Sequence, residues 1–128
     1  MKLGEEFSEG ERHPDYESPR ALPAELAHGL SPTARHALSH PIRRGILREL
    51  NRDGATPRTP DELCPLFPGA SRATIAYHAN VLSDCGSVTV TLASASRGAL
   101  TRSFISEVAA DPEYQRALAA TEQLDVPA

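Results

Sequence analysis

Three helix starts in this chain are marked by a proline that directly follows a side chain able to cap a helix. The pairs are Ser31-Pro32, Thr59-Pro60 and Asp111-Pro112. Proline is favoured at the first helical position, where its missing N–H group is not needed, and Ser, Thr and Asp accept hydrogen bonds from the free N–H groups beside it. Glu62 follows Thr59 at the spacing of a capping box. The pattern predicts three helices with defined first residues.

Another helix is predicted from Pro41 to a stop near Asp53-Gly54. Apolar residues recur along it at the spacing of one helical face, which is expected to face inward. This inward face consists of Ile42, Ile46, Leu47 and Leu50. The residues expected to face outward are Arg43, Arg44 and Arg48.

The helix that opens at Pro60 is predicted to be short. Pro65 has no N–H group to donate to the carbonyl of Asp61, and Phe67-Pro68-Gly69 then predicts a turn. A new helix is predicted over residues 71–84, and Gly86 is suited to its left-handed end. Its inward residues are Ile75, Ala79 and Leu82.

Residues 87–105 are predicted to form a β-hairpin, because two stretches of alternating apolar and polar residues flank a turn-forming segment. The last predicted helix opens at Pro112. One face of it carries Tyr114, Ala117, Leu118, Thr121 and Leu124. The expected fold class is therefore mainly α with a small β-hairpin (α+β), in the order α-α-α-α-β-β-α.

Charge and composition divide the chain into four parts. Residues 1–20, acidic and without apolar periodicity, are predicted to be a disordered arm. Residues 21–30 are either a short helix or a loosely docked segment, and both interpretations stay open. Residues 31–105 hold nine arginines against five acidic residues, whereas residues 106–128 hold one arginine against five acidic residues. A basic centre between acidic ends is compatible with binding of a polyanion by the centre.

Several functional classes are disfavoured by what the sequence lacks. No apolar run approaches the roughly 20 residues that cross a bilayer, and no apolar leader precedes the two cysteines. We therefore expect a cytoplasmic protein without membrane contact. No Gly-x-Ser-x-Gly turn, phosphate-binding glycine loop or His-Glu-x-x-His sequence occurs, so we predict no enzyme activity and no cofactor.

Three stretches of the chain resemble the ArsR-like transcriptional regulators. His40-Pro41-Ile42-Arg43-Arg44-Gly45-Ile46-Leu47-Arg48-Glu49-Leu50 is similar to the family's helix before the helix-turn-helix. Ser71-Arg72-Ala73-Thr74-Ile75-Ala76-Tyr77-His78-Ala79-Asn80-Val81-Leu82 is similar to its recognition helix, and Cys85-Gly86-Ser87-Val88 to the start of its wing. The resemblance covers residues 31–105 and implies a winged helix-turn-helix domain in a dimeric, usually repressing, bacterial regulator of transcription. The longer turn at 67–70 and Pro65 depart from the family pattern.

This resemblance implies that helix 71–84 enters the major groove of a double-stranded DNA operator and that hairpin 87–105 acts as the wing. Arginine pairs with guanine edges, alanine contacts thymine methyl groups, and hydroxyls at a helix N-terminus suit a phosphate. The residues predicted to contact DNA are Ser71, Arg72, Ala73, Thr74, Ala76, Tyr77, Asn80, Arg97 and Arg102. A simpler interpretation also stays open, in which Ser71 and Thr74 only cap the helix and Arg72 is solvated. His78 is expected to pack at the edge of the buried side.

We further expect a homodimer in which the last helix, residues 106–128, contributes the main contact. The predicted dimer residues are Ala34, Leu38, Tyr114, Leu118 and Leu124. A small-molecule effector between the helices is neither supported nor excluded by the sequence.

No metal site is predicted, although many ArsR-like proteins sense metals. Glu62-Leu63-Cys64 resembles the start of the family's cysteine box, but Leu66 stands at the position of the second cysteine. A soft-metal site needs about three or four thiolate or imidazole ligands. His28, His36 and His40 are expected to be ordinary surface or packed residues.

A protein–protein interaction module with the same fold is the alternative to DNA binding. Arg72 is the only cation between Gly69 and Ser96, and the net charge of the chain is -4. In this alternative, the acidic arm or the last helix would dock onto another protein.

Overall fold

The computed structural model, which describes residues 22–52, 56–94 and 100–125, has helices at all the starts expected from the sequence. These helices are α2 (Pro32–Ala37), α3 (Pro41–Asn51), α4 (Pro60–Leu63), α5 (Arg72–Asp84) and α6 (Pro112–Ala120). Their N-cap side chains accept a hydrogen bond from a backbone N–H group of the first turn. The caps are Ser31, His40, Thr59, Ser71 and Asp111. The capping box of Thr59 and Glu62 is confirmed.

Two short helices complete the described helical part. The segment left open at residues 21–30 contains one turn, α1 (Ala24–Ala27). The last helix, expected to run past Leu124, ends at Ala120, and α7 (Glu122–Asp125) follows as a separate turn. A 3₁₀ turn at Cys64–Leu66 continues α4, in agreement with the expected effect of Pro65. The predicted disordered arm, residues 1–20, and the expected helix stop at Asp53-Gly54 lie outside the described residues.

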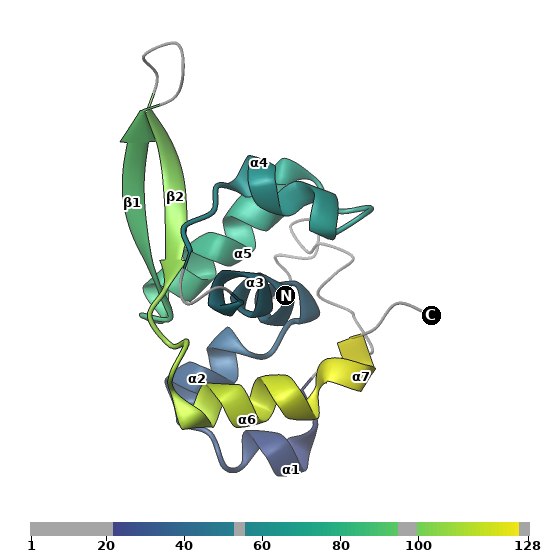
Figure 1. Cartoon of the computed structure of the whole chain (residues 1–128). Helices are drawn as coiled ribbons and strands as arrows, with labels where there is room; N and C mark the ends of the chain where they lie inside the picture. Colours follow the sequence, from purple (N-terminus) through teal and green to yellow (C-terminus); the bar gives the residue numbers. More distant parts are fainter. Residues whose placement is uncertain (1–21, 53–55, 95–99, 126–128) are drawn as a thin grey trace, which may run out of the picture.

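The hairpin consists of β1 (Val88–Ser94) and β2 (Leu100–Ser106), which pair antiparallel with Val90 opposite Phe104 and Leu92 opposite Arg102. On its other side β2 is held by Arg58, which exchanges two backbone hydrogen bonds with Phe104. Figure 1 shows the hairpin standing beside α5, with α6 at the opposite end of the molecule. The described part is thus mixed α+β, with seven α-helices and a two-stranded hairpin, an arrangement compatible with a winged helix.

Helix α3 lies at the centre of the molecule, and its apolar face supplies much of the core. Ile42, Ile46, Leu47 and Leu50 are all buried, as expected. Gly45, on another side of α3, allows the ring of Phe67 to lie directly against the helix backbone, since a Cβ atom there would be 2.5 Å from Cε1 of Phe67. The turn after α4 is therefore packed onto α3 through a residue that has no side chain.

The expectation that Arg43 and Arg44 face outward is wrong. Both residues are buried, Arg44 completely. The reason is the C-terminal end of α2, where carbonyl groups of the last turn can still accept hydrogen bonds. Arg43 donates to the carbonyls of His36 and Ala37, and Arg44 donates to that of Leu38. The two guanidinium groups thus satisfy backbone acceptors inside the molecule.

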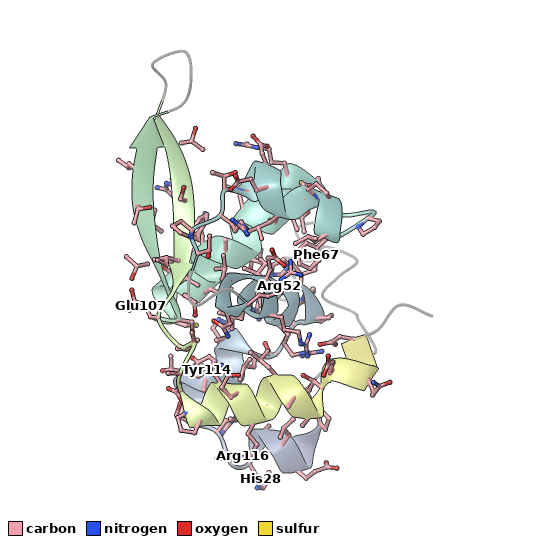
Figure 2. All side chains as sticks on the ribbon, viewed as in Figure 1. His28, Arg52, Phe67, Glu107, Tyr114 and Arg116 are labelled. Carbon is pink, nitrogen blue, oxygen red and sulfur yellow. The ribbon has the colours of Figure 1, made fainter. Side chains whose placement is uncertain are left out.

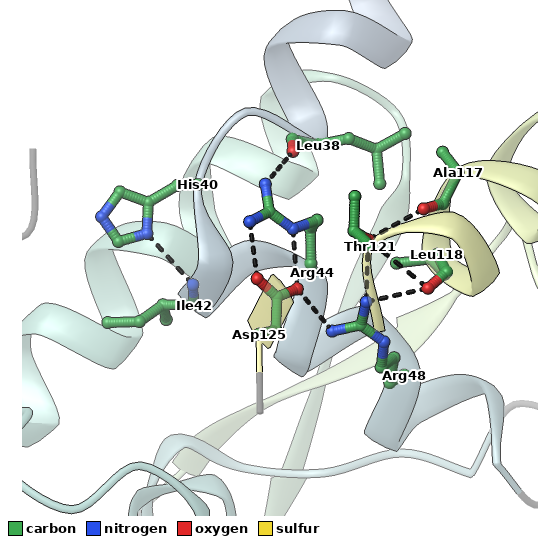
Figure 3. A network of polar contacts seen from close by, with 9 residues as sticks. All are labelled: Leu38, His40, Ile42, Arg44, Arg48, Ala117, Leu118, Thr121 and Asp125. Carbon is green, nitrogen blue, oxygen red and sulfur yellow. Dashed lines mark hydrogen bonds and ion pairs between the residues drawn. The ribbon is translucent and has the colours of Figure 1, made fainter. Parts of the chain in front are cut away.

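Asp125 of α7 ties the C-terminal end of the described chain to the central helix α3 by accepting hydrogen bonds from Arg44 and Arg48 (Figure 3). Arg44 binds both carboxylate oxygens, at 2.8 and 2.7 Å. Arg48, also expected to face outward, is partly exposed but donates to the Leu118 carbonyl and the Thr121 hydroxyl as well. Burial raises the pKa of Asp125, but the hydrogen bonds and positive charges of the two arginines outweigh it, and the pKa is lowered overall.

Every helix in the described ranges falls short of the length and apolar character that a bilayer crossing requires.

Replacement of Asp125 by asparagine should lower the free energy of unfolding by about 3 kcal/mol, because it leaves the buried Arg44 without its counter-ion. Glu122→Gln, an exposed change of equal charge on the same helix, should stay within about 0.5 kcal/mol of the parent protein. Urea denaturation at pH 7 measures both values. Equal stability of the two variants would contradict a structural role for the ion pair.

The lowered pKa of Asp125 also sets a direction for acid stability. The ion pair contributes fully above the pKa of an unfolded aspartate, about 3.9, and its contribution is lost as the pH falls through the lower native value. The Asp125→Asn variant should lack the part of the decrease in the free energy of unfolding that comes from this ion pair, when unfolding is measured from pH 5 to pH 2.

Candidate nucleic-acid interface

The N-terminus of α5 is capped by a side chain of its own segment, that of Ser71. The Ser71 hydroxyl accepts a hydrogen bond from the Thr74 N–H group at 3.0 Å and lies 3.0 Å from the Thr74 hydroxyl. Thr74 is buried and its hydroxyl contacts the Ser71 cap, so this residue does not belong to the exposed side of α5. Ser71 is exposed, and its hydroxyl is occupied as the cap.

One side of α5 is buried and the other is open to solvent. Ile75, Ala79 and Leu82 face the core as expected, and His78 is fully buried with them. Arg72, Ala73 and Tyr77 are exposed, while Ala76 and Asn80 are half-buried. Five of the residues predicted to contact DNA thus form the outward side of one helix.

The hairpin, which is the expected wing, adjoins this outward side through Arg102. Its guanidinium group donates to the side-chain amide oxygen, Oδ1, of Asn80 at 3.2 Å, which links β2 to α5. A neutral amide does not cancel the charge of a guanidinium group, so Arg102 presents a cation beside the helix. We name the outward residues of both elements the α5–wing surface, which consists of Arg72, Ala73, Ala76, Tyr77, Asn80 and Arg102.

A shallow groove runs between α5 and β2 within this surface. Its volume is about 290 Å³. It is lined by Pro60, Arg72, Ala76, Asn80, Thr101, Arg102 and Phe104. Small and amide-bearing side chains on the helix side leave room for a ligand, and Arg72 and Arg102 give the groove two guanidinium groups, which suit phosphate oxygens and base edges.

Arg72 also has an acidic neighbour that the sequence did not point to. Its Nε atom lies 2.5 Å from a carboxylate oxygen of Asp61 on α4, and both side chains are more than half exposed. An ion pair in this setting contributes about 0–1 kcal/mol. A phosphate group can therefore compete for Arg72, although the Asp61 charge opposes its approach.

The remaining predicted contact residue, Arg97, lies outside the described residues. Within the ranges that the structure describes, no cluster of three or more His, Cys, Asp or Glu side chains could hold a metal ion. Burial raises the pKa of the Cys85 thiol, against a smaller lowering by Arg43 and a further raising by Asp84. This favours the neutral thiol over the thiolate that binds metals.

Four of the five predicted dimer residues are buried within the single chain and are corrected to core residues. Ala34, Leu38, Tyr114 and Leu118 belong to the core cluster. The Tyr114 hydroxyl, for example, forms a buried hydrogen bond with Ser87 at 2.8 Å. Only Leu124 of the predicted set is exposed. The four buried side chains are covered within one chain, and the expected homodimer stays a prediction.

Comparisons with protein-family models, curated proteins and solved structures found no match for this chain. The resemblance to ArsR-like regulators thus stays a prediction that rests on the residues quoted above.

Replacement of Ser71 by alanine should lower the free energy of unfolding by about 1 kcal/mol, because the first turn of α5 loses its cap. Ser71→Asp keeps an acceptor for the Thr74 N–H group and should restore most of the loss. Thermal or urea unfolding measures both variants. If both left stability unchanged, the cap would not contribute to holding α5.

Proposed function

We propose that this chain is a sequence-specific, double-stranded DNA-binding regulator of transcription, acting in the cytoplasm, with α5 in the major groove and the hairpin as a wing. The observation that carries the proposal is the α5–wing surface, in which an exposed helix face is continuous with a strand that presents Arg102. A major groove about 12 Å wide admits one helix. The resemblance to a usually repressing family supports repression as the direction of regulation.

The roles of the surface residues follow from their chemistry. Arg72, near the start of α5, is suited to a guanine edge or a phosphate, and Tyr77 to a phosphate or a base. Ala73 and Ala76 allow close approach and can contact thymine methyl groups. Arg102 is suited to the sugar-phosphate backbone beside the helix. With two cations on this surface, we expect an affinity that depends on more than one copy binding neighbouring half-sites.

The first test is selection of duplexes from a random library, followed by fluorescence anisotropy of the full chain at several salt concentrations. Binding to selected duplexes should be tighter than to scrambled ones and should weaken as salt increases, since counterions are released from phosphates. Equal affinity for selected and scrambled duplexes would rule out sequence-specific recognition.

Arg102→Ala should weaken binding to every duplex by a similar factor and reduce the salt slope by about one, as expected for a lost phosphate contact. Arg72→Ala combined with Tyr77→Ala should instead reduce the preference for the selected sequence. Arg116→Ala is the matched control, because Arg116 is exposed on α6 at the opposite end of the molecule (Figure 2). If the control lost as much affinity as the Arg102 variant, the binding surface would not be the α5–wing surface.

Asp61→Asn should strengthen DNA binding, because it removes a negative charge from the interface and releases Arg72 from its ion pair. We expect a gain of about threefold to tenfold at low salt, which shrinks as salt screens the charge. Glu62→Gln is a matched control, since it makes the same charge change one residue away and glutamine preserves the capping box. An equal gain in both variants would assign the effect to overall charge and not to Arg72.

The Asp61–Arg72 pair also favours the second candidate, a winged-helix module that binds another protein. In this candidate the groove would accept a side chain or carboxylate from the partner. Affinity capture from nuclease-treated cell extract, with an Arg102→Ala variant as the comparison, tests it. Partners that vanish on nuclease treatment would argue for DNA binding instead.

A further inference from the structure

The buried side of α5 is held to α3 by a contact between Arg43 and His78. His78 is completely buried, and its Nδ1 atom lies 3.0 Å from Nη1 of Arg43. The other guanidinium donors of Arg43 bind the carbonyls of His36 and Ala37 and the Ser39 hydroxyl. The guanidinium group thus connects the end of α2 to the middle of α5, directly behind the exposed face of that helix.

The chemistry of this contact determines the protonation state of His78. Arginine offers only donors, so Nδ1 of His78 must be the acceptor and can carry no proton. The imidazole is therefore neutral, with its proton on Nε2. A protonated ring would lose this hydrogen bond and place a second positive charge 3.0 Å from the guanidinium group.

His40 is under the same requirement for a different reason. Its Nδ1 atom accepts a hydrogen bond from the Ile42 N–H group at 3.1 Å, as the N-cap of α3. Its ring lies 4.2 Å from that of His78, measured between centroids, with the planes tilted by 32°. Two imidazoles from two helices are thus in contact, and each uses Nδ1 as an acceptor.

The guanidinium group that contacts His78 disfavours a second positive charge at this position. Arg43 of α3 supplies a positive charge, and the Tyr77 ring of α5 meets His78 edge-on with 5.0 Å between centroids. At the end of α5, burial raises the pKa of the Cys85 thiol, which keeps that group neutral. Asp84 beside it is an exposed carboxylate.

We propose that Arg43 is a positioning residue that acts through His78 to hold α5 in place, and that this contact operates only while His78 and His40 are neutral. Acidification therefore weakens the packing of α5 against α3 and, if the proposed function holds, weakens DNA binding. The histidine pair makes the DNA-facing helix sensitive to protons without touching DNA.

The size of the effect follows from linkage between protonation and folding. A histidine in an unfolded chain gains a proton near pH 6.5, whereas the native contacts require the neutral form. Below that pH the unfolded state binds more protons, so stability falls as the pH falls. The folding equilibrium constant should decrease about tenfold for each pH unit and for each histidine that stays neutral.

Urea denaturation of the full chain between pH 7.5 and pH 5.0 tests the pair without reference to DNA. The wild-type protein should lose stability steadily below pH 6.5. The double variant His40→Asn, His78→Gln keeps an acceptor at both positions but cannot be protonated there, and its profile should be nearly flat. His28→Gln, a change of an exposed histidine at the end of α1, should retain the wild-type profile.

A flat wild-type profile, or a double variant that declines as steeply as wild type, would overturn the proposal. Arg43→Gln provides a second route, since it keeps an amide donor and removes the positive charge. Its profile should be shallower than that of wild type, and an unchanged slope would remove Arg43 from the account.

The positioning role has its own readout in DNA affinity, measured with a selected duplex at pH 7.5 and pH 5.5. Affinity at pH 7.5 should be close to wild type for His78→Gln and reduced for His78→Leu, which offers Arg43 no acceptor. Wild type should lose more affinity at pH 5.5 than the double variant, and equal losses would overturn the link to binding. If no duplex binds at either pH, the proposed function fails, while the urea profiles still decide the histidine proposal.

Discussion

The structure depends on the burial of two adjacent guanidinium groups on its central helix. Arg43 and Arg44 follow one another on α3, and an unpaired buried charge would cost several kcal/mol. Arg43 donates hydrogen bonds to the end of α2 and to His78 of α5. Arg44 donates to the Leu38 carbonyl and to the carboxylate of Asp125 on α7. The requirement to satisfy these donors thus sets the positions of α2, α5 and α7 around α3.

The same requirement changes how the charge of the chain relates to function. The basic centre of the sequence suggests a broadly positive face, but most of its described arginines are engaged within the molecule. Arg52 and Arg58 share Glu49, and Arg72 is paired with Asp61. Arg102, bound to the neutral amide of Asn80, keeps its charge at the edge of α5. Recognition of DNA would therefore rely on local placement of a few cations more than on a long-range field.

The sequence predicted the helix starts well, because a cap followed by proline is a local signal that tertiary contacts seldom override. The helical spacing of apolar residues in α5 and the alternating residues of the hairpin are local signals of the same kind. Arg43 and Arg44 were misplaced because a helical pattern assigns charged residues to the outside, and carbonyl groups from another helix cannot be seen in it. The apolar face with Tyr114 and Leu118 indicates in the sequence that it is buried, but it does not indicate whether a second copy or the same chain covers it; in the structure both residues belong to the core of the chain. The Asp61–Arg72 pair depends on how the turn after α4 folds back, for which the sequence held no signal.

The central claim is that α5 and β2 together form a DNA-binding surface. Titration of the isotope-labelled full chain with a selected duplex, followed by amide chemical-shift mapping, tests it most directly. The largest shifts should occur at Arg72, Tyr77, Asn80 and Arg102, and α6 should be little affected. Shifts concentrated on α1 and α6, or none at any duplex concentration, would contradict it.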